Sequence, residues 1–216
     1  MASTLPPTVR TRAQETIVSL FSHIREQGEK DYLGESVSQL AHSLQAAHQA
    51  RISGADNETI LAALLHDIGH FIPMYADMPP MIAPGGCKVG RGSHDVFGEK
   101  YLRQLGFSEK ICELVGAHVL AKRFLTATDQ GYYDNLSERS KQTLQLQGGP
   151  FSEEEVEKAK KDPLLTEKLN VRRWDDLAKV PGMAVEPLEA YEAMAAESLL
   201  SEYFNDLLKS LLLTLI

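Results

Sequence analysis

Cysteine is scarce in this chain, with only Cys87 and Cys112 among 216 residues. Two thiols cannot build a disulfide framework or a four-thiolate metal site. Long apolar runs are also missing, since no window approaches the roughly 18 uninterrupted apolar residues that a transmembrane helix requires. The segment Met1–Arg12 lacks the apolar stretch that secretory signals contain. We therefore expect a cytoplasmic protein without a membrane span.

Positive charge is in deficit as well. The chain has 22 Lys and Arg against 30 Asp and Glu, which gives a formal net charge of −8. Binding to nucleic-acid phosphates requires concentrated positive charge, so we expect no nucleic-acid partner. A small anion in a local basic pocket remains compatible with this balance. The hydrophobic share of 43% is typical of a globular protein, and the length suffices for a sizeable core.

Helical spacing of apolar residues dominates the chain, and strand signals are weak throughout. We predict an all-α fold, with 1–216 forming one domain whose core spans about 31–180 and carries the N- and C-terminal helices. Asn57 and Ser93 are the expected N-caps of two helices. The segment 71–92 holds four prolines and four glycines, which predicts a long loop, often a functional lid. The helices are expected near 13–28, 36–53, 58–65, 94–105, 108–118, 137–146, 153–161, 171–179 and 187–212.

A His-Asp pair, His66 and Asp67, directly follows the apolar run 61–65. Burying such a pair is costly unless both side chains have partners. If the helix continues, His70 faces the same side as His66. Imidazole and carboxylate ligands without thiolate suit iron, manganese or zinc, and one aspartate can bridge two metals. His42, His118 and Asp175 lie on other helices and favour a metal site, whereas His23 and His48 are assigned to hydrogen-bonded or solvent-facing positions.

The order His42, His66-Asp67, His118, Asp175 resembles the ligand order of the HD-domain superfamily, whose members are helical and mostly metal-dependent phosphohydrolases. Segments 31–46, 61–70, 116–123, 147–150 and 172–175 resemble the PhnZ-type organophosphonate oxygenases, a branch with a mixed-valent di-iron site. Tyr32-x-x-Glu35, Ala121-Lys-Arg123 and Gln147-Gly-Gly-Pro150 are the motifs that point to this branch. The resemblance implies an HD-domain helical bundle with two iron ions, Fe(II) and Fe(III), in its core.

The resemblance also implies a role for each matching residue. Tyr32 is similar to a gating tyrosine that leaves the metal when substrate binds, and Glu35 to its partner, which contacts a cationic nitrogen. His70, Lys122 and Arg172 resemble phosphonate-binding groups, and His70 and Lys122 join Tyr32 and Glu35 as catalytic residues. Ser140 and Thr143 are expected to donate hydroxyl hydrogen bonds to the same phosphonate. The implied iron ligands are His42, His66, Asp67, His94, His118 and Asp175, with Asp67 bridging.

The implied reaction converts a 1-hydroxyalkylphosphonate and O2 to a carboxylic acid and phosphate. The substrate is (R)-1-hydroxy-2-aminoethylphosphonate, giving glycine, or its N-trimethylated analogue, giving glycine betaine as in TmpB-type enzymes. A quaternary ammonium prefers aromatic or polarizable walls, and the loop offers such residues, which favours the methylated substrate. Such an enzyme would act after a 2-oxoglutarate-dependent hydroxylase in the same pathway. The loop residues are Phe71, Met74, Tyr75, Met78 and Met81.

Two other classes of protein are compatible with the same residues. One is an HD-type phosphohydrolase that acts on a phosphomonoester or nucleotide with a metal-activated water as nucleophile. In that class Tyr32, Glu35 and Lys122 have no evident combined role. The other is a helical domain that metal ions stabilise without catalysis, against which the number of polar residues directed at one site argues. Oxygen consumption coupled to phosphate release would distinguish an oxygenase from a hydrolase.

Overall fold

The computed structural model describes residues 6–29, 36–72, 80–82, 85–86 and 88–213, and it is helical in most of them. The prediction of an all-α fold is confirmed. Short 3-10 turns, η2 (Ile68–His70) and η3 (Leu188–Tyr191), join some of the helices. The helices are α1 (Pro7–Gly28), α2 (Gln39–Ile52), α3 (Asn57–Leu65), α5 (His94–Leu105), α6 (Glu109–Gly116), α7 (His118–Thr128), α8 (Gln130–Asn135), α9 (Glu138–Leu146), α10 (Glu153–Ala159), α11 (Leu165–Leu177) and α12 (Glu192–Leu213).

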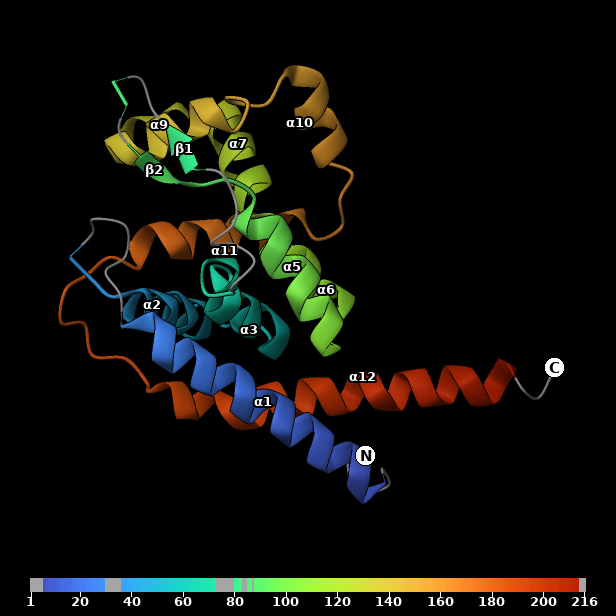
Figure 1. Cartoon of the computed structure of the whole chain (residues 1–216). Coiled ribbons are helices and arrows are strands. Elements are labelled where there is room, and N and C mark those ends of the chain that lie inside the picture. The colour runs from blue at the N-terminus through green and yellow to red at the C-terminus, as the bar shows by residue number, and fades with distance from the viewer. Residues whose placement is uncertain (1–5, 30–35, 73–79, 83–84, 87, 214–216) are drawn as a thin grey trace.

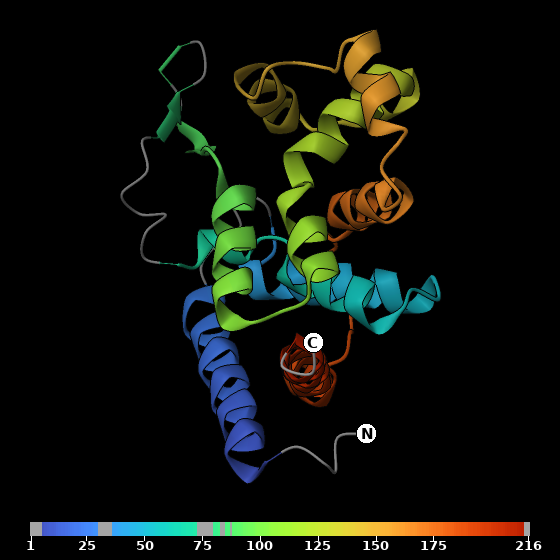
Figure 2. The same ribbon diagram turned by 90° about the vertical axis from the view of Figure 1, so that its right-hand side faces the viewer.

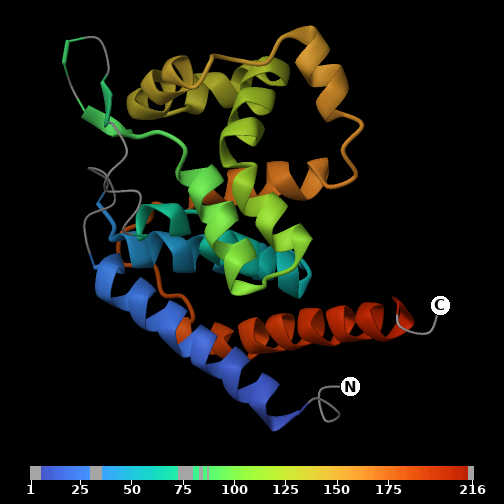
Figure 3. The same ribbon diagram turned by 45° about the vertical axis from the view of Figure 1, so that its right-hand side comes forward.

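A central layer is formed by α2, α3 and α11, which pack against one another (Figure 1). Helices α5 and α6 pair with each other, and α5 also contacts η2. Helices α8, α9 and α10 gather around α7, which rests on α11 (Figure 3). The long helices α1 and α12 contact each other on the opposite side of the central layer (Figure 2). The hydrophobic core takes most of its side chains from α1, α3, α6 and α12, with further ones from α2, α5 and α11.

The hydrophobic core explains why α3 lies at the centre of the molecule. Every residue from Thr59 to Leu65 is buried, so this helix is apolar on all sides. The inner faces of α1 and α12 belong to the same cluster of buried side chains, for example through Phe21 and Leu199. The chain stays buried through His66 and Asp67, so the His-Asp pair is held in the interior.

Capping residues set where the helices begin, with two differences from the sequence prediction. Asp56, rather than Asn57, is the cap of α3, because its carboxylate accepts a hydrogen bond from the Thr59 amide at 3.0 Å. Ser93 precedes α5 in a left-handed conformation with φ of 64°, and its side chain caps nothing. The predicted cap at Asn57 is therefore wrong, because the neighbouring aspartate takes that role, whereas Ser93 holds the predicted cap position of α5 without a side-chain hydrogen bond.

The segment 71–92 contains a short antiparallel hairpin instead of a continuous loop. Strands β1 (Pro80–Ile82) and β2 (Lys88–Arg91) form this two-stranded sheet. Phe71 packs in the hydrophobic core, whereas Met74, Tyr75 and Met78 lie outside the described residues. Met81, also expected to line a quaternary-ammonium site, lies on β1 and is half-buried. Within the described parts of the chain, no helix combines the length and apolar character needed for a bilayer crossing.

Candidate metal and anion site

The His-Asp pair stands at a change of helix type. Helix α3 ends at Leu65, and Asp67 precedes the 3-10 turn that carries His70. The α-helix does not continue through Gly69, so the condition under which His70 would face the same side as His66 is not met. Because the backbone turns at Asp67, His66 approaches Oδ2 of the Asp67 carboxylate, whereas His70 approaches Oδ1.

A first group of ligand atoms surrounds one point between α2, α3 and α11. Nε2 of His42 and Nε2 of His66 lie 3.7 and 3.6 Å from Oδ2 of Asp67. The same two nitrogens lie 3.0 and 3.6 Å from Oδ1 of Asp175. Ligands bound about 2.1 Å from one ion are separated by roughly 3 to 3.5 Å, so these four atoms have metal-binding spacing.

Hydrogen bonds to backbone carbonyl oxygens fix the orientation of the His42 and His66 imidazoles. Nδ1 of His42 donates to the carbonyl oxygen of Ala178 at 2.8 Å, and Nδ1 of His66 donates to that of Ala63 at 2.8 Å. A carbonyl oxygen only accepts, so each Nδ1 carries a proton, and each Nε2 is the nitrogen that could bind a metal ion in the group. Such outer contacts are typical of metal-ligating histidines.

A second group faces the other oxygen of Asp67. Nε2 of His94 and Nε2 of His70 lie 3.6 and 3.8 Å from its Oδ1. The rings of His70 and His94 stack at 4.3 Å, and the ring of His118 meets that of His94 edge-on at 5.0 Å. Asp67 thus presents one oxygen to each group, which is the geometry of a carboxylate that bridges two cations.

The buried polar atoms of this cluster fit a pair of metal ions. Oδ2 of Asp67 and both ring nitrogens of His94 are buried and have no hydrogen-bond partner among the described residues. Unpartnered buried polar atoms are costly, and cations at the two groups would supply the missing partners. Burial, reinforced by neighbouring His70, lowers the pKa of His94 to about 3 and keeps this imidazole neutral. Although burial opposes ionisation, the surrounding histidines hold the pKa of Asp67 well below its ordinary value.

Close backbone packing brings the two sides of the second group together. A Cβ atom added at Gly69 would lie 1.9 Å from the carbonyl oxygen of His94. Only glycine allows η2 and the start of α5 to approach so closely. Ser93 is the one non-glycine residue with positive φ in the described chain, and it directly precedes His94. Such strain is tolerated where the surrounding structure requires a particular side-chain position.

A buried lysine lies beside this cluster. Lys122, on α7, is 3% exposed, and its Nζ donates to Oγ1 of Thr143 on α9 at 3.0 Å. Burial and the nearby charge of Arg172 lower the pKa of Lys122 to about 7. Ser140 lies one turn before Thr143, and its hydroxyl accepts a hydrogen bond from Ser137. Lys122 and Thr143, two of the residues predicted to bind phosphonate, are therefore in contact.

Arg172 is the second buried cation, and protein atoms engage it on several sides. Its Nη1 lies 2.7 Å from Oδ2 of Asp175 and 2.6 Å from Nε2 of His118. Its Nη2 and Nε contact the two carboxylate oxygens of Asp176 at 2.6 and 3.1 Å. The hydroxyl of Tyr132 lies 2.9 Å from Nε. In this structure Arg172 thus contacts two of the predicted metal ligands.

Two predicted residues cannot be placed, and two residues that contact Arg172 were not predicted. Tyr32 and Glu35 lie outside the described residues, so their predicted gating role stays a prediction. Sequence reasoning missed Tyr132 and Asp176. Asp176 adjoins Asp175 in the run Arg172-Arg-Trp-Asp-Asp, which was a usable signal. Tyr132 carried no signal, because its contact with Arg172 crosses between two helices.

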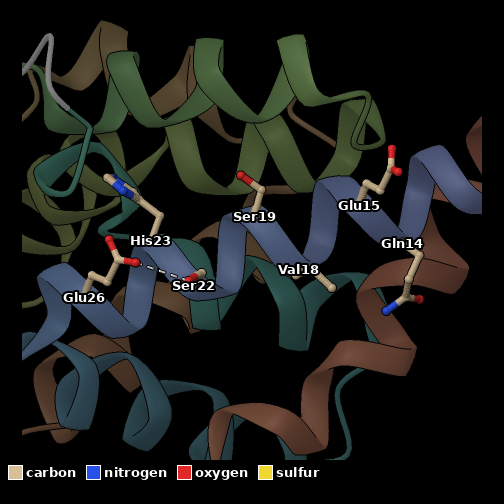
Figure 4. A pocket seen from close by; sticks show the side chains of 7 residues that line it. All are labelled: Gln14, Glu15, Val18, Ser19, Ser22, His23 and Glu26. Carbon is tan, nitrogen blue, oxygen red and sulfur yellow. Dashed lines mark hydrogen bonds between the residues drawn. The ribbon is translucent and has the colours of Figure 1, made fainter.

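A separate hollow of about 550 Å³ follows the outer face of α1. Figure 4 shows its lining, in which polar side chains predominate and Ser22 contacts Glu26. No predicted ligand lines this hollow. Its histidine, His23, is bonded to the carbonyl oxygen of Phe71 at 2.8 Å. The hollow is therefore distinct from the His-Asp cluster.

The sequence is similar to several known proteins. The family model of the HD domain matches residues 40–179. An uncharacterised protein of Acanthamoeba polyphaga mimivirus is 38% identical over 191 residues, which cover 88% of this chain and 83% of that protein. A hydroxymethylphosphonate dioxygenase of Gimesia maris is 37% identical over 177 residues, which cover 82% and 85%. A glycine-betaine-forming [1-hydroxy-2-(trimethylamino)ethyl]phosphonate dioxygenase of Leisingera caerulea is 40% identical over 152 residues, which cover 70% and 74%.

Proposed function

The chain belongs to the HD-domain family, and because two of its relatives are named as phosphonate dioxygenases, we propose that it is a metal-dependent oxygenase that cleaves the carbon–phosphorus bond of a 1-hydroxyalkylphosphonate. The bridging position of Asp67 between two groups of imidazoles is the observation that carries this proposal. The relatives named as phosphonate dioxygenases support it. The substrate and O2 give one carboxylic acid and one phosphate, so one oxygen atom of O2 enters each product.

The first ion would be held by His42, His66, Asp67 and Asp175. The second would be held by Asp67, His94 and His118. When bound, the pair, which we expect to be iron in the Fe(II) and Fe(III) states, supplies the activation of O2 and a Lewis-acidic anchor for the substrate. The protein supplies the orientation of each imidazole and a dry interior, in which the ligand atoms are almost fully buried.

We assign Lys122, Thr143 and Ser140 to the phosphonate oxygens, together with Arg172 and His70. A dianionic phosphonate requires charge-assisted donors, and Lys122 is a buried cation without a carboxylate in direct contact among the described residues. In its protonated form its Nζ would donate to a phosphonate oxygen, with Thr143 keeping the side chain in place. His70 lies nearly as close to Asp67 as His94 does, at 3.8 against 3.6 Å, so the metal content of a His70 variant tests its assignment.

We propose 1-hydroxy-2-(trimethylammonio)ethylphosphonate or its 2-amino analogue as substrate, with glycine betaine or glycine as product. Glu35 would contact the cationic nitrogen, and Tyr32 would leave the metal when substrate arrives. A 2-oxoglutarate-dependent hydroxylase would supply the C1 hydroxyl, and we place both reactions in the cytoplasm. Because one relative is named for hydroxymethylphosphonate, that compound belongs in the same substrate panel.

The test is a panel of the three hydroxyphosphonates and one phosphomonoester, offered to protein that was loaded with iron under anaerobic conditions. Phosphate release and O2 consumption are recorded together. The proposal expects phosphate release from a hydroxyphosphonate only in the presence of O2, with equal amounts of both. Phosphate release from the phosphomonoester at an equal rate with and without O2 would instead indicate a phosphohydrolase.

A further inference from the structure

Arg172 is held along one edge by two residues that the proposed reaction does not otherwise use. Asp176 accepts from Nη2 at 2.6 Å and from Nε at 3.1 Å, which forms a two-point contact with the guanidinium plane. The hydroxyl of Tyr132 donates to Asp176 at 2.6 Å and accepts from Nε of Arg172 at 2.9 Å. These three hydrogen bonds of the guanidinium group, two to Asp176 and one to Tyr132, therefore define the plane and the direction of the Arg172 side chain.

The opposite edge of the guanidinium faces the metal ligands. Nη1 carries two hydrogens, and its two acceptors are Oδ2 of Asp175 at 2.7 Å and Nε2 of His118 at 2.6 Å. Arginine only donates, so Nε2 of His118 must be the acceptor in the second contact. That nitrogen has one lone pair, which serves either the Arg172 hydrogen or a metal ion, and not both.

We propose that Tyr132 and Asp176 are positioning residues that aim the Nη1 group of Arg172 at the anion site, an inference that rests on the proposed function. When Nε2 of His118 is engaged by a metal ion, one N–H of Nη1 loses its acceptor. Asp176 and Tyr132 still hold the other edge, so this hydrogen stays directed at the space next to the metal ligands. A phosphonate oxygen there is the acceptor that replaces His118.

Burial makes this arrangement effective. Arg172 is 4% exposed, so an N–H without an acceptor is costly and a well-placed anion is favoured. Asp175 and Asp176 together balance the guanidinium before substrate arrives, and neither has to move for the new contact. Without Asp176 or the Tyr132 hydroxyl, the guanidinium could rotate about its long side chain and would lose its fixed direction.

The first test follows the geometry itself by NMR in metal-free protein. We expect a slowly exchanging Nε–H signal from Arg172, identified by its loss in Arg172→Lys. Its exchange should accelerate in Asp176→Asn and in Tyr132→Phe, and should be unchanged in the control Tyr133→Phe. Tyr133 lies on the same helix, and the structure gives its hydroxyl no hydrogen bond in the described chain. An Nε–H signal that exchanges equally in all of these proteins would overturn the proposal.

The second test measures phosphonate affinity by calorimetry in manganese-loaded protein without O2, using hydroxymethylphosphonate as the probe. We expect Asp176→Asn to bind about tenfold or more weakly and Tyr132→Phe a few-fold more weakly, because a charge-assisted contact loses its direction. Asp176→Glu should recover part of the loss, and metal stoichiometry should be unchanged. If Asp176→Asn does not fold, Tyr132→Phe decides the question.

The two tests separate this inference from the proposed function. If the parent protein binds no phosphonate at all, the proposed function fails, while the NMR result still decides whether Asp176 and Tyr132 orient Arg172. If the parent binds the probe and both variants bind it equally well, the positioning role is wrong and the function stands. Equal loss of affinity in the exposed control Asp134→Asn would show a general charge effect and would also contradict the positioning role.

Discussion

Removing the charge of Lys122 should stabilise the fold and weaken phosphonate binding at the same time. The side chain is 3% exposed, and its pKa falls from 10.5 to about 7 because of burial and the charge of Arg172. A lower pKa in the folded state means that the folded protein binds protons less readily than the unfolded chain. The charged lysine is therefore destabilising, and Lys122→Met removes this cost while keeping the length of the side chain.

The magnitude follows from the pKa. At about 1.4 kcal/mol for each tenfold change, a decrease from 10.5 to about 7 corresponds to roughly 5 kcal/mol as an upper limit. The cost is fully present below pH 7 and declines to zero as the pH rises from about 7 to 10.5. We expect metal-free Lys122→Met to be more stable than the parent by roughly 2 kcal/mol or more at pH 7. The difference should shrink at pH 9.5.

The assay is urea unfolding of both metal-free proteins at the two pH values, followed by circular dichroism. Phosphonate affinity of the manganese-loaded proteins is measured in parallel, and we expect Lys122→Met to bind about tenfold or more weakly. Affinity of the parent should fall as the pH rises through about 7, and Lys122→Arg should remove this dependence because arginine stays protonated. A parent that is more stable than Lys122→Met at pH 7 would refute the reasoning.

Three further changes test other parts of the site. Asp67→Ala removes both carboxylate oxygens of the proposed bridge, so bound iron should fall from the expected two ions per chain to one or none by elemental analysis; two ions in the variant would exclude the bridge. Gly69→Ala places a Cβ 1.9 Å from the His94 carbonyl oxygen and should lower the free energy of unfolding by about 3 kcal/mol or more. In the control Gly54→Ala, the added Cβ lies in open space at φ of 75°, and the free energy of unfolding should fall by only about 1 kcal/mol. Equal decreases in the two variants would contradict the close approach at Gly69. In Tyr32→Phe, O2 should oxidise the ferrous iron faster in the absence of substrate, as followed by absorption spectroscopy. An unchanged oxidation rate would leave Tyr32 with a packing role.

Much of the fold was accessible from the sequence because apolar periodicity reports which face of a helix is buried. The apolar run 61–65 followed by His66 and Asp67 indicated that a polar pair enters the interior, and the structure places it there. The hairpin of 80–82 and 88–91 was not predicted, since prolines and glycines dominate that segment. The domain limits stay a prediction.

Contacts between helices account for what the sequence could not supply. Nothing local to Arg172 indicates that Tyr132, forty residues earlier, contacts it, because α8 and α11 meet only in the folded chain. The 3-10 turn after Asp67 was equally hidden, and it places His70 beside Oδ1 of Asp67 rather than in line with His66. Residue types were therefore predictable, whereas the division of the imidazoles between the two carboxylate oxygens required the structure.

The most direct measurement of the central claim is the source of the oxygen atoms in the products. Iron-loaded protein is given the hydroxyphosphonate that it turns over under ¹⁸O2 in unlabelled water, and both products are analysed by mass spectrometry. The account predicts one labelled oxygen in the carboxylic acid and one in the phosphate, since O2 is consumed as the carbon–phosphorus bond breaks. Products without ¹⁸O would contradict it, and label taken up from H2¹⁸O in the reverse experiment would identify the reaction as hydrolysis.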